Sequence, residues 1–227
     1  MDLTIDPVAV RVLGVLIEKE VATPDYYPLS LNALVNACNQ KSNREPVMQL
    51  SEEEVAAAID RLRQVRLAWQ RSVAGARVFK YEHNIRSLFP LTDQESGALC
   101  VLMLRGPQTV GEVRLRTERL CTFASLEETE KVLRGLISRE DGPFILELPR
   151  QPGRKEPRFV HLFSGREWAT TQALAGEIPG GGPEGVAANP PSSATDRIAA
   201  LEATVAELKD QMGHLRHEFE EFRKVLE

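Results

Sequence analysis

Apolar residues recur at helical spacing in two stretches near the start of the chain. Each stretch fits the i, i+3, i+4 pattern of a helix with one apolar side. The first contains Val12, Leu13, Leu16 and Ile17, and the second contains Val55, Ile59, Leu62 and Val65. The pattern predicts a helical domain, with a polar segment at residues 39–54 between its second and third helices.

Capping residues predict where the helices begin. Asp6 precedes Pro7, and proline is favoured at the first helical position because its missing N–H has no partner to lose there. Ser30 is placed to cap a second helix. Ser51 and Glu54 have the spacing of a capping box, in which the two residues satisfy each other's backbone N–H groups. The same spacing recurs later at Thr92 and Glu95, Thr109 and Glu112, and Ser125 and Glu128.

The chain repeats itself. The segment VRVLGVLIEKE (10–20) aligns with SGALCVLMLRG (96–106), an offset of 86 residues. The segment SEEEVAAAIDRLRQ (51–64) aligns with SLEETEKVLRGLIS (125–138), an offset of 74 residues. The difference, 86 − 74 = 12, places an insertion of a dozen residues in the first unit, mostly within the polar segment.

A hairpin signal follows each third helix. The segment LAWQRSVAGARVFKYEH has two strand-like runs around Ala74 and Gly75, and the second unit has runs at 144–148 and 159–163. Three helices followed by a two-stranded hairpin is the winged-helix arrangement. The predicted fold class is therefore α+β and mainly helical, with winged-helix domains at residues 1–90 and 91–175.

A linker and a long helix are predicted beyond residue 175. Nine of the twenty residues at 176–195 are Gly or Pro. Residues 196–227 carry apolar side chains at alternating spacings of three and four, which is typical of a coiled coil. A homo-oligomer through this seam is expected, and packing of the helix on its own globular part is the alternative. The seam comprises Ile198, Leu201, Val205, Leu208, Met212, Leu215, Phe219, Phe222 and Leu226.

The net charge of −5 comes entirely from the end of the chain. Residues 1–90 hold 11 basic and 11 acidic residues, residues 91–168 hold 12 of each, and residues 169–227 hold 5 against 10. Domains that bind nucleic acid strongly are usually basic, so the neutral balance argues against strong non-specific DNA affinity. No run of about 20 apolar residues appears, and a cytoplasmic protein without membrane segments is expected.

Catalytic chemistry is not expected. Cys38, Cys100 and Cys121 have no regular spacing and read as reduced thiols. Two histidines, His83 and His161, end predicted strands. The others, His214 and His217, lie on the tail and lack further metal ligands nearby. The sequence predicts no enzyme activity, cofactor or metal site.

DNA association is the first functional hypothesis, because the third helix of a winged helix normally enters the major groove. Here the third helices begin with acids, Glu52 and Glu53 in one unit and Glu127 and Glu130 in the other, and phosphates repel acids. Contacts to phosphate are therefore expected from basic residues of the hairpins and of the second unit's middle helix. The candidates are Arg150, Arg154, Lys155, Arg158, Arg114, Arg116, Arg119, Arg71, Arg77 and Lys80.

Protein binding is the competing hypothesis, with the winged-helix surfaces and segment 39–48 as the docking site. This segment carries more directional polar side chains than a turn needs, and such loops often carry function. The structural alternative is that these side chains shape the turn and that Arg44 braces a carboxylate. The candidates are Asn39, Gln40, Lys41, Asn43 and Arg44.

The order of these parts resembles that of a known family. The segments LGVLIEKE and TPDYYPLSLNALVNACNQKSNREPVM, followed by SEEEV, are similar to those of the YceH family of bacterial proteins. The resemblance covers about residues 5–168 and implies tandem winged helices, often followed by a coiled-coil tail. It brings no catalytic or binding residues with it, so DNA and an unidentified protein both stay open as partners.

Overall fold

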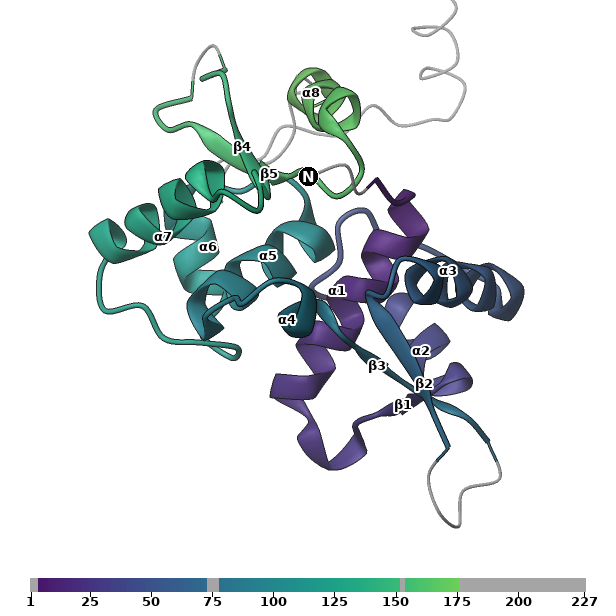
Figure 1. Cartoon of the computed structure of the whole chain (residues 1–227). Helices are drawn as coiled ribbons and strands as arrows, with labels where there is room; N and C mark the ends of the chain where they lie inside the picture. Colours follow the sequence, from purple (N-terminus) through teal and green to yellow (C-terminus); the bar gives the residue numbers. More distant parts are fainter. Residues whose placement is uncertain (1–3, 73–77, 152–153, 176–227) are drawn as a thin grey trace, which may run out of the picture. The chain divides into compact units, whose positions relative to one another are not determined.

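The computed structural model describes residues 4–72, 78–151 and 154–175, in two halves with the same order of elements (Figure 1). The first half contains α1 (Pro7–Ala22), α2 (Leu31–Cys38), α3 (Glu52–Gln64), β2 (Ala68–Arg71) and β3 (Lys80–His83). The second contains α5 (Asp93–Arg105), α6 (Val110–Arg116), α7 (Leu126–Ser138), β4 (Ile145–Leu148) and β5 (Arg158–His161). This arrangement confirms the predicted α+β class.

Four further elements were not predicted from the sequence. They are a 3-10 turn, η1 (Pro24–Tyr26), the strand β1 (Leu29–Ser30), and the helices α4 (Ile85–Leu88) and α8 (Arg166–Ala175). The strand β1 pairs with β3, so the first half has an antiparallel sheet of order β1-β3-β2 rather than a two-stranded hairpin. In the second half, β4 pairs with β5, and a single bridge between Gln108 and Phe159 occupies the corresponding place.

The predicted caps are confirmed, with one difference. Capping boxes close between Ser51 and Glu54 and at both other sites built on threonine. At α7, the Ser125 hydroxyl accepts from the N–H of Glu128 as expected. The Glu128 carboxylate, however, accepts from the N–H of Ala124 at 2.6 Å instead of closing the box on Ser125. It still satisfies a backbone donor at the helix start.

The first helix of each half is buried on all sides. Residues 9–17 of α1 and residues 96–104 of α5 are each nine consecutive buried residues. The two helices pack against each other, and α1 also packs on α2 and α3 (Figure 1). A single apolar stripe, which the spacing predicts, accounts for only part of this burial.

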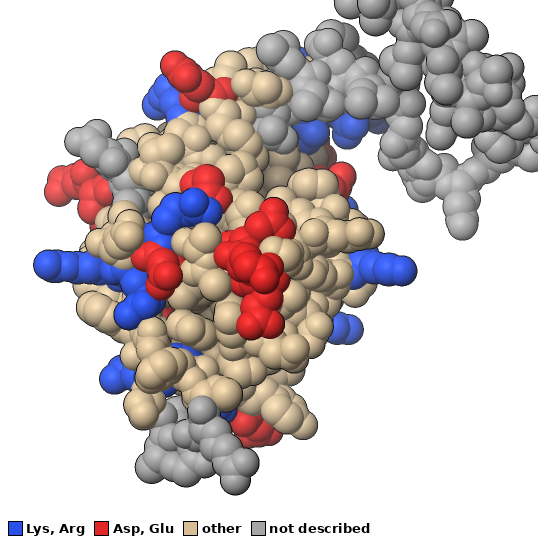
Figure 2. All heavy atoms as spheres, turned by 90° about the vertical axis from the view of Figure 1, so that its right-hand side faces the viewer, with Lys and Arg blue, Asp and Glu red and all other residues tan. Residues whose placement is uncertain are grey.

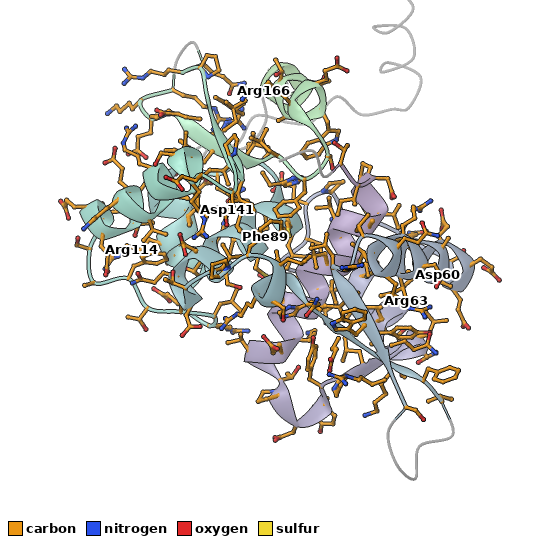
Figure 3. The ribbon with its side chains drawn as sticks, in the orientation of Figure 1. Asp60, Arg63, Phe89, Arg114, Asp141 and Arg166 are labelled. Atoms are coloured by element: carbon orange, nitrogen blue, oxygen red, sulfur yellow. The ribbon has the colours of Figure 1, made fainter. Side chains whose placement is uncertain are left out.

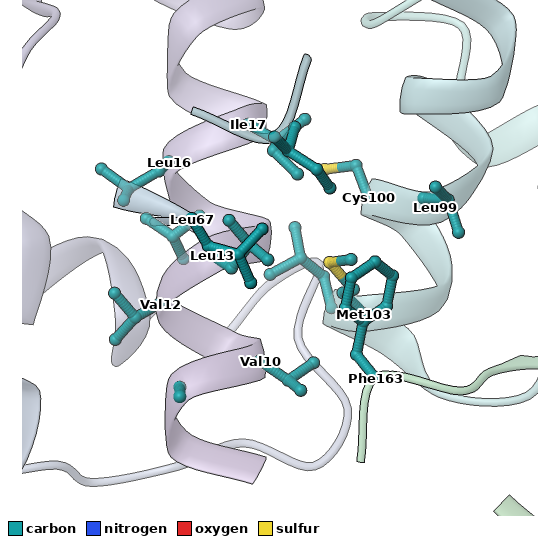
Figure 4. Close-up of a cluster of buried hydrophobic side chains, with 14 of the residues drawn as sticks. Val10, Val12, Leu13, Leu16, Ile17, Leu67, Leu99, Cys100, Met103 and Phe163 are labelled. Carbon is teal, nitrogen blue, oxygen red and sulfur yellow. The ribbon is translucent and has the colours of Figure 1, made fainter. Parts of the chain in front are cut away.

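Gly14 lies in the contact between α1 and α5. A methyl group built on its Cα would come within 3.0 Å of Leu104 Cδ2 and 3.1 Å of Met103 Cβ. The Gly14 carbonyl accepts a hydrogen bond from Cys100 Sγ at 3.3 Å. Figure 4 shows Leu13, Ile17 and their neighbours on α1 facing Cys100 and Met103. The contact depends on the absence of a side chain at residue 14.

One hydrophobic cluster includes buried residues of both halves, from Ile5 to Phe163. A smaller cluster lies between the second hairpin and α8 and contains Leu148, Val160, Leu162 and Ala169. The boundary predicted at residues 90 and 91 stays a prediction, and the core crosses it. The predicted linker and coiled coil lie outside the described residues. Within the described residues, no helix has the length and apolar character needed to cross a membrane.

The close approach at Gly14 generates a stability prediction. Substituting Gly14→Val should lower the free energy of unfolding by about 1–3 kcal/mol, because the new side chain overpacks the helix contact. Gly135→Val on α7 is the matched control, since nothing lies within 4 Å of a Cβ there. Its effect should stay within about 0.5 kcal/mol. Urea unfolding followed by circular dichroism measures both. Equal midpoints for the two variants would contradict the proposed role of Gly14.

Candidate functional site

The inserted segment between α2 and α3 is closed at its base by Asn39. The side-chain amide of Asn39 donates to the Leu50 carbonyl at 2.8 Å, and its oxygen accepts from the Leu50 N–H at 2.8 Å. This pair of bonds holds residues 40–49 as a loop of fixed span. Asn43 has a positive φ of 60°, a conformation that asparagine tolerates better than most residues.

Arg44 is the centre of this loop. Its side chain is fully buried and forms a two-pronged ion pair with Glu18, at 2.6 and 3.1 Å. It also donates to the carbonyls of Ala37 and Asn43 and to the Gln40 side chain. The structural alternative, in which Arg44 braces a carboxylate, therefore describes the observed geometry. Asn39 and Arg44 are fully engaged inside the protein.

A cleft of about 750 Å³ lies beside this loop, between the end of α1, α5 and α6. It brings together two predicted sets that the sequence keeps far apart. Gln40 and Asn43 line it from the loop, and Arg116 and Arg119 line it from α6 and the segment that follows. The remaining charged lining residues are Lys19, Arg105, Glu18 and Glu118.

Arg105 is one of the cleft residues that were not predicted from the sequence. It ends α5 and donates to the Asn43 side chain, which joins the loop to the second half. Burial lowers the pKa of Arg105, and the neighbouring charge of Arg116 adds to this effect. A basic residue in the last turn of an apolar helix is a common feature, so its sequence context held no signal of this contact.

The second hairpin places most of its predicted cations in solvent. Arg150, Arg154 and Lys155 are exposed. Arg158, in β5, is half-buried, and burial followed by the charge of Arg154 lowers its pKa. On α6, Arg114 is exposed on the outer side of the second half (Figure 3). Arg116 pairs with Glu112 at 3.4 Å, one helical turn away.

The first hairpin is less basic in practice than its sequence suggests. Arg71 forms an ion pair with Glu82 on the adjacent strand at 2.6 Å, and Lys80 is half-buried. Arg77 lies outside the described residues. The same hairpin exposes apolar side chains that the sequence analysis did not single out, namely Trp69 (42%), Val78 (60%) and Phe79 (56%).

The acidic starts of the third helices are exposed. Glu52, Glu53 and Glu54 are exposed in the first turn of α3, and in α7 Glu127 is exposed and Glu128 is half-buried. Figure 2 shows the face that carries α3, where acidic side chains gather near the middle and basic side chains are set apart from them. This end of α3 therefore has the wrong charge for entry into a DNA groove.

Two cysteines, Cys38 and Cys100, and two histidines, His83 and His161, are buried. Burial raises the pKa of Cys38 to about 12 and also raises that of Cys100, so neither thiol is activated. His83 bonds Glu20 at 2.9 Å and thereby lowers the pKa of that carboxyl group. Burial lowers the pKa of His161 to about 3. The His161 ring stacks on the indole ring of Trp168. His214 and His217 lie outside the described residues.

No group of three or more His, Cys, Asp or Glu side chains within the described ranges is arranged to hold a metal ion. The expected absence of a metal site, cofactor and catalytic centre stays a prediction. The nine predicted seam residues of the tail also lie outside the described residues.

The described chain is thus an α+β protein whose two similar halves share one core and enclose a charged cleft. A family model described as "Protein of unknown function, DUF480" matches residues 5–154. A UPF0502 protein of Aeromonas hydrophila is 48% identical over 216 residues, which cover 93% of this chain and 94% of the relative. A UPF0502 protein of Vibrio parahaemolyticus is 46% identical over 224 residues, covering 97% and 98%. The chain belongs to this bacterial DUF480/UPF0502 family, the same family as YceH.

The ion pair of Arg44 generates a prediction on stability. Glu18→Gln should lower the free energy of unfolding by about 3 kcal/mol, because it leaves the buried guanidinium without a counter-charge. Asp60→Asn is the matched control, since Asp60 pairs with Arg63 on the outer face of α3 (Figure 3). Exposed pairs contribute about 0–1 kcal/mol. Chemical unfolding of both variants tests this, and a loss for Glu18→Gln no larger than the control's would refute it.

Proposed function

We propose that this protein is a non-enzymatic DNA-associated regulator built from tandem winged helices. The fold assignment is supported by the same order of three helices and a hairpin in both halves. It is supported further by equivalent caps at the helix starts and by a strand or bridge before each middle helix. We place the protein in the cytoplasm and propose that it self-associates through the heptad pattern of residues 196–227.

The observation that supports DNA association is that the second hairpin has exposed cations without ion-pair partners among the described residues. Among the described residues, Arg150, Arg154 and Lys155 are exposed and take part in no ion pair. An unpaired exposed cation releases phosphate counterions on binding without first breaking a bond within the protein. In the first hairpin, by contrast, Arg71 is already paired with Glu82. The second hairpin, including Arg158 in β5, is therefore the proposed phosphate contact, and exposed Arg114 of α6 is a further candidate.

Sequence selection by the third helices is not part of this proposal. Exposed acids at the starts of α3 and α7 would meet phosphates before they reached any base edge. Contacts to phosphate position a protein on DNA and carry no sequence information directly. The proposed binding is therefore weak and sequence-independent for one chain. Joint binding by an oligomer would strengthen it by about 10²–10⁴-fold.

Neutralising the second hairpin tests the proposal. The triple variant Arg150→Gln, Arg154→Gln, Lys155→Gln should bind duplex DNA more weakly at every sequence. Its slope of log K against log salt should fall in magnitude by about 2.7, at about 0.9 for each lost phosphate contact. Fluorescence anisotropy of full-length protein with mixed duplexes across a salt series measures both quantities.

The control is a triple variant with the same change in net charge at paired cations, Arg61→Gln, Arg63→Gln, Arg134→Gln. It should keep nearly the wild-type slope. If the control lowers affinity as much as the hairpin variant, only net charge matters and the site assignment is wrong. If the wild-type protein binds no DNA at low salt, the DNA proposal itself fails.

Protein docking is the second candidate function, and the exposed apolar residues of the first hairpin favour it. Trp69 lies in β2, and Val78 and Phe79 directly precede β3, the strand that pairs with β2; all three are exposed. Aromatic residues are enriched at protein interfaces and are costly to leave in water. Within segment 39–48, Asn39 and Arg44 are engaged internally, which leaves exposed Lys41 as the main candidate there.

A matched pair of variants separates this candidate from DNA association. Cross-linking in cells with full-length protein should yield a partner that Phe79→Asp loses and Arg150→Gln retains. Phe79→Asp should weaken the complex because it places a carboxylate in an apolar interface, where the charge has neither water nor a partner. A partner retained equally by both variants would exclude the first hairpin as the docking site.

A further inference from the structure

A smaller cavity is lined by later residues of the inserted loop than the cleft is, and it has a different chemical character. Its volume is about 170 Å³, roughly six water volumes. It is formed where α1, the loop, the end of α5, the segment after β5 and α8 meet. The lining residues used below are Arg11, Glu45, Met48, His161, Ser164 and Trp168.

Arg11 gives the cavity a buried positive charge. The residue is 1% exposed, and its two terminal nitrogens donate to the carbonyls of Cys38 at 3.2 Å and Pro46 at 2.6 Å. Those partners are neutral. The nearby carboxylate of Glu18 is engaged with Arg44. Among the described residues, Arg11 has no ion-pair partner, and its Nε is a buried donor without a hydrogen-bond acceptor.

Two further buried polar atoms belong to residues that line the same cavity. His161 Nδ1 and Ser164 Oγ have no hydrogen-bond partner within the described structure. His161 is 1% exposed, and its ring stacks on Trp168 with centroids 4.6 Å apart. A buried polar atom without a partner costs free energy. Three residues that line this cavity each carry such an atom, which favours a polar ligand there.

We infer that this cavity binds a small organic carboxylate of about six non-hydrogen atoms. The guanidinium of Arg11 matches a carboxylate in charge and in its planar donor geometry. The Ser164 hydroxyl donates to the second oxygen. Trp168 and Met48 supply apolar walls for the hydrocarbon part. Glu45, an exposed residue of the lining, provides a site for an ammonium group if the ligand also carries one.

The site is independent of DNA association, because none of its lining residues is a proposed phosphate contact. It joins parts of both halves, since Arg11 comes from α1 and Trp168 from α8. Occupation should therefore stabilise the fold as a whole, as any ligand that binds only the native state does.

Three probes of equal size test the inference: butyrate, its neutral isostere butyramide, and the zwitterion alanine. The chain has two tryptophans, so Trp69→Phe in the full-length protein leaves Trp168 as the only indole reporter. Butyrate should change the Trp168 emission in a saturable way and raise the melting temperature. Butyramide should bind about tenfold more weakly or not at all, because it lacks the charge. If alanine binds more tightly than butyrate, the same carboxylate site also has a contact for an ammonium group, which we assign to Glu45.

Variants localise the effect. Arg11→Gln should abolish the butyrate response, with circular dichroism as the check that the chain still folds. Ser164→Ala removes one hydroxyl and keeps the packing, and it should weaken butyrate several-fold, whereas Ser138→Ala, an exposed serine of α7, should not. Equal binding of butyrate and butyramide would overturn the inference, as would the absence of a response to both carboxylates or a response that Ser164→Ala leaves unchanged.

Discussion

The contact between α1 and α5 is the interaction on which the rest of the structure depends. Both helices are buried over nine consecutive residues, because each has its own half on one side and the other half's helix on the opposite side. The missing side chain at Gly14 sets how closely they approach. This contact holds the two halves together. The cleft, the small cavity and the shared core depend on it.

Near that contact, the buried positive charges outnumber the carboxylates that pair with them. Two guanidinium groups, those of Arg11 and Arg44, are buried beside α1, and a single carboxylate, that of Glu18, pairs with one of them. Arg44 thereby becomes part of the framework, with five acceptor atoms from four residues around it. Arg11 is held by two carbonyls alone and keeps an unsatisfied donor. The same residue type at two neighbouring sites therefore has a structural role at Arg44 and the inferred binding role at Arg11.

Local features of this fold were predictable from the sequence, and long-range features were not. Caps such as Ser51 with Glu54 depend on residues three apart, and the hairpins depend on turn residues between strand-like runs. The pairing of the two-residue strand β1 with β3 has no such local signal. Nor did the sequence indicate that Arg11 would be buried, or that Arg105 would reach Asn43. Those contacts join residues 27 to 62 positions apart, so spacing alone could not reveal them.

During synthesis, α1 is made before the elements that bury it. The backbone N–H of Ile5 donates to the carbonyl of Phe163 at 2.8 Å, so a residue made near the beginning is held by one made much later. At about 5–20 residues per second, α1 waits several seconds on the ribosome before α5 is complete. During that interval the side of α1 around Gly14 has no cover. Until its second half emerges, the nascent chain therefore presents an apolar helix of the kind that chaperones bind.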